Sequence, residues 1–296
     1  MENYVIETKS VRRSFGGTPA VRDLNLGVRR GSVYGFLGRN GAGKTTAIKM
    51  LVGLLKPDAG EIRIHGVDPW KFTVADRQRV GYLSEKQTLM PSMKVDALIR
   101  FTSSFYPNWD FALCDRILKR FQIDPAKRIK ELSNGAMRQV GFLLAIAQRP
   151  ELLILDEPAA TLDVVARRDF LDEVLELLRE EGKTVLFSSH ILSDVERVAD
   201  EIGILANGAL KLSEPLDQLK DTVKQVRFYE FPNGTNSFAI PGAFQLKKTG
   251  AEVLATLRVG SEDALQQLAA AHGCRFEVRD LSLEDIFVEV VRDNQS

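Results

Sequence analysis

One short stretch limits what this chain can fold into more than any other. Residues 38–46 read Gly-Arg-Asn-Gly-Ala-Gly-Lys-Thr-Thr, which fits the spacing G-x-x-x-x-G-K-[ST]. The apolar segment 33–37 before it predicts a strand, and segment 47–52 after it predicts the start of a helix. Strand, glycine-rich loop and helix in this order predict an α/β fold whose loop amides and helix N-terminus bind phosphate.

The loop residues are expected to act through both backbone and side chains. Lys44 is expected to reach the outer phosphates, and the hydroxyl of Thr45 to ligate Mg²⁺. The residues expected to contact the bound phosphates are Gly38, Arg39, Asn40, Gly41, Ala42, Gly43, Lys44, Thr45 and Thr46. An ordinary glycine-rich turn is the alternative, and the flanking strand and helix argue against it.

Composition bounds the class of protein. A length of 296 residues predicts two domains, and 44% hydrophobic residues suffice for ordinary cores. Basic and acidic residues each number 40, so no broad nucleic-acid-binding surface is expected. The cysteines, Cys114 and Cys274, are far apart and suggest reduced thiols in a cytosolic protein. Residues 1–10 do not resemble a signal peptide, and no apolar run approaches the roughly 20 residues that span a bilayer.

Two carboxylates follow a strongly apolar segment. Residues 152–155 predict a buried strand, which ends at Asp156 and Glu157. Charge at such a buried position indicates function. Asp156 can hold Mg²⁺, directly or through water, and Glu157 can polarise the water that attacks a γ-phosphate. A helix cap by Asp156 is the alternative.

Three other positions carry functional expectations. His190 follows the predicted strand 184–187, at the strand end where α/β sheets place ligands. Asp163 is expected to cap a helix over 164–181. Phe15 can either pack in the core or stack on an adenine ring.

These residues resemble the ATP-binding subunits of ABC transporters, over roughly residues 4 to 215. The shared elements, in the family's order, are Phe15, the loop 38–46, the loop at Glu85, the signature segment 132–139, the Asp156–Glu157 strand end and His190. The resemblance implies an α/β fold: a P-loop NTPase core of the ABC type over 1–220, with an N-terminal antiparallel β region and a helical subdomain inserted at about 88–150. A small C-terminal α+β accessory domain is expected over 221–296, with an ending similar to that of exporter-type members.

The resemblance also implies a role for each residue. Phe15 stacks on the adenine of ATP, and Lys44 with the loop amides binds its phosphates. Thr45, Asp156 and Glu85 hold Mg²⁺, Glu157 is the general base and His190 senses the γ-phosphate. Ser133 and Gly135 complete the ATP site of a partner subunit, and Asp163 contacts that partner.

The implied function is ATP hydrolysis that drives a membrane-spanning permease on a separate chain. The subunit is expected to form a homodimer, or a heterodimer with a second ATP-binding subunit, around two ATP molecules. It is expected to be cytoplasmic, peripheral on the inner face of the cell membrane through its permease, and to bind no nucleic acid. The alternative is a soluble or regulatory ABC-type ATPase that is not coupled to transport.

The chain departs from the family pattern at several positions. Glu85 stands where Gln is usual, Arg39 replaces a Pro, and Asn134 and Ala136 alter the signature. Glu85 and Ala136 are the basis for an alternative interpretation, in which the protein is a regulatory module that closes on ATP without hydrolysing it. The retained Lys44, Asp156, Glu157 and His190 predict an active ATPase.

Overall fold

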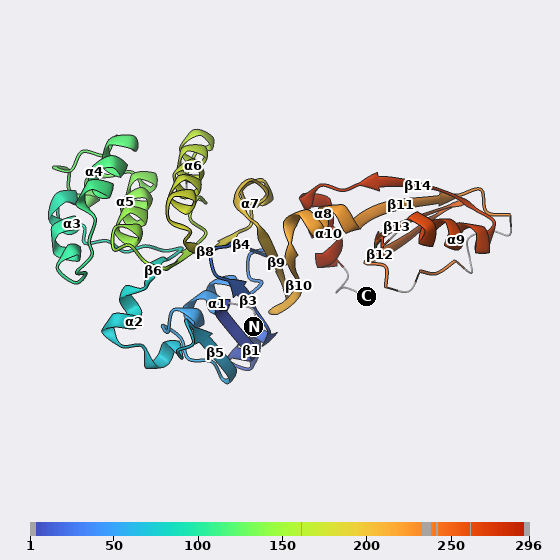
Figure 1. Ribbon diagram of the computed structural model, residues 1–296, viewed down its shortest axis with the longest axis horizontal. Helices are drawn as coiled ribbons and strands as arrows, with labels where there is room; N and C mark the ends of the chain where they lie inside the picture. The colour runs from blue at the N-terminus through green and yellow to red at the C-terminus, as the bar shows by residue number, and fades with distance from the viewer. Residues whose placement is uncertain (1–3, 161, 233–237, 241, 261, 293–296) are drawn as a thin grey trace. The chain divides into compact units, whose positions relative to one another are not determined.

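The computed structural model describes residues 4–160, 162–232, 238–240, 242–260 and 262–292 (Figure 1). The chain divides into two compact units, Met1–Leu210 and Lys211–Ser296. The division into an ATP-binding domain over 1–220 and an accessory domain over 221–296 stays a prediction. Each unit is described by itself below. No helix among the described residues is both long enough and apolar enough to cross a membrane.

The first unit is organised around a six-stranded sheet, whose strand at residues 209–215 continues past Leu210 into the second unit. In spatial order its strands are β10 (Ala209–Pro215), β9 (Glu201–Ala206), β4 (Val33–Leu37), β8 (Thr184–Ser189), β7 (Leu152–Asp156) and β6 (Val80–Leu83). β4, β6, β7, β8 and β9 pair in parallel. Every residue of β4, β7 and β8 is buried, because the sheet is covered on both faces and its strands are nearly continuous apolar runs. The α/β fold expected from the sequence is confirmed.

The predicted site residues lie at one edge of this sheet, because they follow the ends of parallel strands. Leu37 pairs with Ser189, and Asp156 pairs with Ser188. The loops that leave β4, β6, β7 and β8 therefore emerge together at the carboxyl ends of the strands, where α/β sheets bind ligands.

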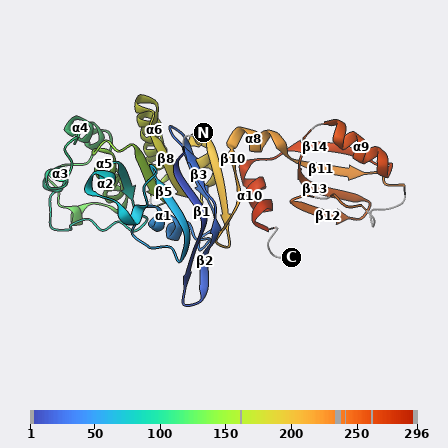
Figure 2. The ribbon, with the colours of Figure 1, turned by 60° about the horizontal axis from the view of Figure 1, so that its bottom comes forward.

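A second, antiparallel sheet holds the N-terminal segment. Its strands are β1 (Tyr4–Phe15), β2 (Thr18–Leu24), β3 (Gly27–Arg29) and β5 (Ala59–Ile64). β2, β3 and β5 all pair with β1, and Figure 2 shows the long β1–β2 ribbon. Its inward residues share one hydrophobic core with the start of the parallel sheet and α1. The predicted antiparallel β region is confirmed.

Helices complete the first unit. They are α1 (Lys44–Leu51), α2 (Val74–Gln78), α3 (Val95–Ser103), α4 (Phe111–Arg120), α5 (Asn134–Ile146), α6 (Val164–Glu181) and α7 (Leu192–Val198), with short 3₁₀ turns η1 (Pro69–Lys71) and η2 (Ile129–Glu131). α3, α4 and α5 gather into one bundle, which is the helical insertion expected at about 88–150 (Figure 1). Short polar side chains start these helices: Asp110 accepts a hydrogen bond from Leu113 N–H, and Ser133 accepts one from Ala136 N–H.

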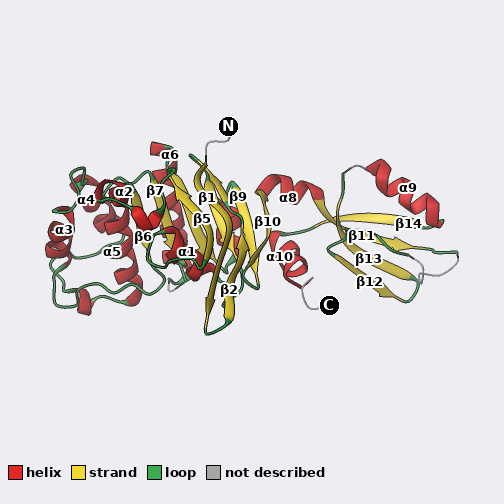
Figure 3. Ribbon diagram, turned by 90° about the horizontal axis from the view of Figure 1, so that it is seen from below, coloured by secondary structure: helices red, strands yellow, loops and turns green. Residues whose placement is uncertain are grey.

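The second unit is an antiparallel sheet with helices. The order is β12 (Gln245–Thr249), β13 (Glu252–Arg258), β11 (Val223–Tyr229) and β14 (Arg275–Asp280), and the helices are α8 (Leu216–Thr222), α9 (Glu262–His272) and α10 (Leu283–Arg292) (Figure 3). Leu265 of α9 belongs to the same buried hydrophobic cluster as Val226 and Phe228 of β11, which places α9 over one face of the sheet. Ser282 and Asp285 form the predicted capping box. No signal in the sequence predicted β12, and the expected cap at position 261 lies outside the described residues.

Candidate functional site

The loop after β4 turns into α1 through a glycine in a conformation that other residues rarely adopt. Gly43 has φ 108° and precedes the first residue of the helix. A Cβ atom at this position would lie 2.3 Å from the carbonyl oxygen of Ala20. From behind the loop, the N–H of Gly208 donates to the carbonyl of Ala42 at 3.0 Å. Steric and conformational demands together require glycine here.

The loop lines a cavity of about 220 Å³ at the carboxyl edge of the sheet. The lining residues are Ala20, Arg39, Asn40, Gly41, Gly43, Lys44, Thr45, Thr46, Glu85 and Glu157. The cavity thus brings together the loop and two of the predicted carboxylates. The N-terminus of α1 contributes partial positive charge, and no acidic residue occupies its first turn.

Lys44 lines this cavity and is itself buried. Its Nζ donates to the carbonyl of Gly38 at 2.6 Å and lies 3.1 Å from Oε1 of Glu157. The side chain of Lys44 is only 5% exposed, so its ammonium acts in surroundings of low dielectric constant. The ion pair supplies the partner that a buried charge needs.

Glu157 lies in the left-handed region of backbone conformation, with φ 49°. Such a conformation costs a non-glycine residue about 1–2 kcal/mol and persists only where neighbouring groups hold it. On the other side of the carboxylate, Oε2 lies 2.8 Å from Nδ1 of His190. Since an ionised carboxylate only accepts, Nδ1 of His190 carries the proton in this pair. The expected Glu157, His190 and Lys44 are therefore adjacent.

Asp156 is fully buried beside Glu157. Ser188 Oγ donates to Asp156 Oδ1 at 2.7 Å and accepts from the N–H of Glu157 at 2.9 Å. Burial raises the pKa of the Asp156 carboxyl, while hydrogen bonds from Ser188 and Thr45 lower it. Ser188 is a positioning residue that the sequence did not single out, because its role depends on the pairing of β7 with β8.

The donor set suits Mg²⁺. Oδ2 of Asp156 is buried without a hydrogen-bond partner, and the hydroxyl of Thr45 lies 3.3 Å from Oε2 of Glu85. Among the described residues, no cluster of three or more His, Cys, Asp or Glu forms a metal cage. Mg²⁺ is commonly held by one or two carboxylates together with substrate phosphates, so these oxygens fit that ion.

Eight of the expected residues do not line the cavity within the described part of the chain: Gly38, Ala42, Asp156 and His190, each bonded to or next in the chain to a lining residue, and Phe15, Ser133, Gly135 and Asp163. Phe15 is 49% exposed, and the guanidinium carbon of Arg13 lies 4.9 Å from the centre of its ring. Ser133 and Gly135 lie at the start of α5, and Asp163 caps α6 by accepting from Val165 and Ala166 N–H.

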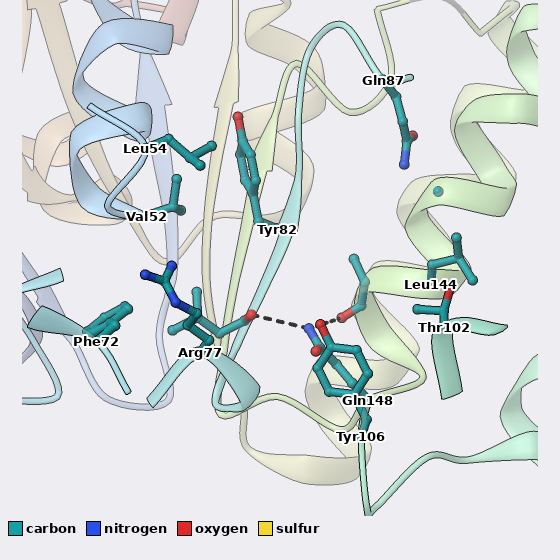
Figure 4. Close-up of a pocket in the computed structure, with 13 residues that line it drawn as sticks. Val52, Leu54, Phe72, Arg77, Tyr82, Gln87, Thr102, Tyr106, Leu144 and Gln148 are labelled. Carbon is teal, nitrogen blue, oxygen red and sulfur yellow. Dashed lines mark hydrogen bonds between the residues drawn. The ribbon is translucent and has the colours of Figure 1, made fainter. Parts of the chain in front are cut away.

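A larger cavity of about 310 Å³ contains none of the predicted site residues. Figure 4 shows Gln148 in the lining of this cavity, where Nε2 donates to the carbonyls of Val80 and Ala145 at 3.2 Å each. Its lining includes Val52, Leu144 and Tyr82 and only one charged side chain, Arg77. The smaller cavity, with its loop and helix N-terminus, is therefore the one suited to phosphate.

Loop, lysine and carboxylate geometry together define a nucleotide-hydrolysing P-loop site on an α/β sheet. The family model described as ABC transporter matches residues 21–160. The bacitracin transport ATP-binding protein BcrA of Bacillus licheniformis is 30% identical to this chain, and the alignment covers 97% of each of the two proteins. The chain belongs to the ABC transporter ATP-binding proteins, and it is an ATPase.

Two further comparisons agree. The ABC transporter ATP-binding protein YtrB of Bacillus subtilis (strain 168) is 30% identical, over 73% of this chain and 74% of that protein. A solved structure described as the ATP-binding subunit of an ABC transporter superposes with a TM-score of 0.66 and 28% identity, over 73% of this chain and 92% of the other. The expected ABC-type core is thereby confirmed.

Proposed function

We propose that this chain hydrolyses ATP with Glu157 as the general base, and that hydrolysis drives a membrane-spanning permease on a separate chain. The observation that carries the catalytic part is the position of the Glu157 carboxylate, between Nζ of Lys44 and Nδ1 of His190. It lines the cavity that the phosphate loop forms.

Each side chain has a defined task in this scheme. The amides of residues 38–46 and the ammonium of Lys44 bind the phosphates and stabilise negative charge in the transition state. Glu157 orients a water molecule and accepts its proton as the water attacks the γ-phosphorus. His190 donates from Nδ1 to Glu157, which fixes the orientation of the carboxylate beside the phosphate loop.

Bound Mg²⁺ would neutralise phosphate charge. Thr45 and Asp156 are the protein groups proposed to hold it, with Glu85 as a third. The substitution of Glu for the family's usual Gln adds negative charge at this position. We propose that Glu85 remains a ligand, because its carboxylate already faces the hydroxyl of Thr45.

The residues outside the cavity favour a two-subunit site. Ser133 and Gly135 at the start of α5, and Asp163 at the start of α6, do not line the chain's own cavity, and Val164 and Val165 beside Asp163 are 77% and 70% exposed. Two copies, or this chain and a related subunit, would place the Ser133–Gly135 segment over the partner's ATP. The N–H groups at the start of α5 are suited to phosphate.

The proposed membrane partner follows from the relatives. One relative is named as a bacitracin transport ATP-binding protein, and the described residues of this chain contain no membrane-spanning helix. We propose a cytoplasmic subunit that reaches the membrane through its permease. Closure on ATP and opening after hydrolysis would then shift the permease between two states.

The proposed test is ATP hydrolysis by wild type and the Glu157→Gln variant, with size-exclusion chromatography of both in ATP and Mg²⁺. Glu151→Gln is the matched control, because Glu151 immediately precedes β7 at its opposite end. Wild type and the control are expected to hydrolyse ATP, and Glu157→Gln to be inactive and to accumulate as an ATP-dependent dimer. Full activity of Glu157→Gln would overturn the role of Glu157. ATP-dependent dimers of a wild type that stays inactive, even with its permease, would favour the regulatory alternative.

A further inference from the structure

Arg138 is buried in the first turns of α5, with 4% exposure. Its Nη1 donates to the carbonyls of Ser84 at 2.6 Å and Glu85 at 2.5 Å. Its Nη2 donates to Asp156 and Glu157, each at 2.5 Å, and its Nε to Pro158 at 3.1 Å. A guanidinium has five N–H donors in a fixed plane, so these carbonyls use every one of them.

The five carbonyls belong to two loops that are far apart in the sequence. Ser84 and Glu85 follow β6, and residues 156–158 end β7 and begin the next loop. Both loops carry carboxylates of the nucleotide site. One planar side chain therefore fixes the spacing of these loops, and it does so from α5, the helix whose N-terminal end carries Ser133 and Gly135.

We propose that Arg138 is a positioning residue for ATP hydrolysis. Its side chain fixes the positions of the loops of Glu85 and Glu157 relative to each other and to the start of α5. This inference rests on the proposed function, in which Glu157 is the base. The left-handed conformation of Glu157 fits the proposal, because it needs neighbouring groups to hold it and Arg138 binds the carbonyls on both sides of its Cα. Movement of α5 against a partner's nucleotide would be transmitted to both carboxylates.

The charge of Arg138 and its planar fork can be separated by substitution. Arg138→Lys keeps a positive charge near Asp156, but an ammonium has three donors on a flexible stem and cannot reproduce the fork. If Arg138 only balanced buried negative charge, the lysine variant would retain activity. If the planar fork positions the loops, the lysine variant would lose activity.

Gln148, two residues after the other end of the same helix, offers a matched control. It is buried, and Nε2 donates to two backbone carbonyls, one of them in β6 (Figure 4). Gln148→Met removes these bonds and keeps a side chain of similar length. It therefore reproduces the loss of buried hydrogen bonds to carbonyls without touching the loops of Glu85 and Glu157.

The experiment compares wild type, Arg138→Lys, Gln148→Met and Glu157→Gln in three measurements. These are kcat for ATP, the Kd of a non-hydrolysable fluorescent ATP analogue, and amide hydrogen exchange without nucleotide in peptides covering 84–88 and 155–160. We expect Arg138→Lys to lower kcat by about 10- to 100-fold, the size of effect that misplaced catalytic groups produce. Its Kd should stay within about twofold of wild type, because the phosphate loop is unchanged. Exchange should be faster in both peptides, and Gln148→Met should show neither effect.

Each other outcome has a definite meaning. Wild-type kcat in Arg138→Lys overturns the positioning role and leaves the proposed function intact. If amide exchange in both peptides of Arg138→Lys equals that of wild type, Arg138 does not hold the two loops. If Gln148→Met loses as much kcat as Arg138→Lys, the proposal is also overturned. An inactive wild type, or an active Glu157→Gln, overturns the proposed function instead, and the exchange data still decide whether Arg138 holds the two loops.

Discussion

Ser188 donates a hydrogen bond to Oδ1 of Asp156 across adjacent parallel strands, at 2.7 Å. The same hydroxyl oxygen accepts the N–H of Glu157 at 2.9 Å. One side chain on β8 thus holds both the carboxylate that ends β7 and the backbone of the next residue. The register that pairs Asp156 with Ser188 makes this possible.

Ser188→Ala should destabilise the protein by about 1–3 kcal/mol, because it leaves a buried carboxylate oxygen and a backbone N–H without their partner. The loss of stability in Ser188→Ala should depend on pH.

Burial raises the pKa of Asp156 above its ordinary 3.8, and removal of the Ser188 hydrogen bond should raise it further. A raised folded-state pKa means that the stability contribution of Asp156 is complete below 3.8 and falls as pH rises through the folded value. Urea unfolding at pH 7.5 and below pH 4 should therefore show a larger difference between variant and wild type at the higher pH. An equal difference at both values would contradict this account.

Phe15→Ala should weaken ATP binding and leave binding of inorganic tripolyphosphate unchanged. Base stacking on an aromatic ring contributes about 1–3 kcal/mol, which corresponds to roughly a 5- to 150-fold rise in Kd. The ring is 49% exposed, so folding stability should change little. Phe105→Ala, at another exposed phenylalanine, is the control. Isothermal titration with both ligands measures the effect, and equal losses for the two ligands would exclude stacking.

Two glycines of the phosphate loop should respond differently to alanine. Gly41 has φ 81°, and an added Cβ would meet no described atom within 4 Å, so Gly41→Ala should cost only the conformational strain of about 1–2 kcal/mol. At Gly43 an added Cβ would also meet the Ala20 carbonyl at 2.3 Å, so Gly43→Ala should cost about 3–5 kcal/mol and abolish ATP binding. Urea unfolding and ATP titration of both variants test this. Equal effects would show that the close approach to Ala20 is relieved by movement of the backbone.

Glu151→Gln should reduce the loss of stability in acid. Arg79 donates to both oxygens of Glu151, at 2.7 and 3.0 Å, and this bond lowers the pKa of that carboxyl from 4.5 to about 2. A lowered folded-state pKa gives stability that is present above pH 4.5 and is lost as pH falls toward 2. Across that range the free energy of unfolding should fall less steeply in the variant, as measured by urea unfolding at a series of pH values. If the free energy of unfolding falls equally with pH in variant and wild type, the ion pair is too well solvated to contribute to stability.

Local signals in the sequence predicted much of the fold. The helix over 164–181 has the predicted bounds, and Asn207-Gly208 forms the predicted turn between β9 and β10. Both depend on residues close together in the chain, namely a capping Asp163 and a pair that tolerates positive φ. By contrast, β12 is a polar edge strand whose side chains alternate poorly, and the short α7 begins at Leu192 without a side-chain cap, so neither was predicted.

The candidate site was predicted at the level of motifs rather than of contacts. Lys44, Glu157 and His190 each follow a strand of the parallel sheet, so the order of strand ends sufficed to bring them together. Arg138 lies within the signature segment 132–139, but nothing nearby in the sequence indicates its partners. Those partners lie 18 to 54 residues away along the chain, and only the packing of α5 against two loops brings them within reach.

The support behind the phosphate loop has a consequence for how the site arises during synthesis. The N–H of Gly208 holds the carbonyl of Ala42, and Gly38 packs so closely on Leu205 that an added Cβ would lie 2.7 Å from the Leu205 carbonyl. A nascent chain therefore carries the complete motif 38–46 long before it carries the strand and turn that hold it. The loop gains its final shape only after a closure of more than 160 residues along the chain. Nucleotide binding should accordingly be acquired late, when β9 and its turn have left the ribosome and joined the sheet.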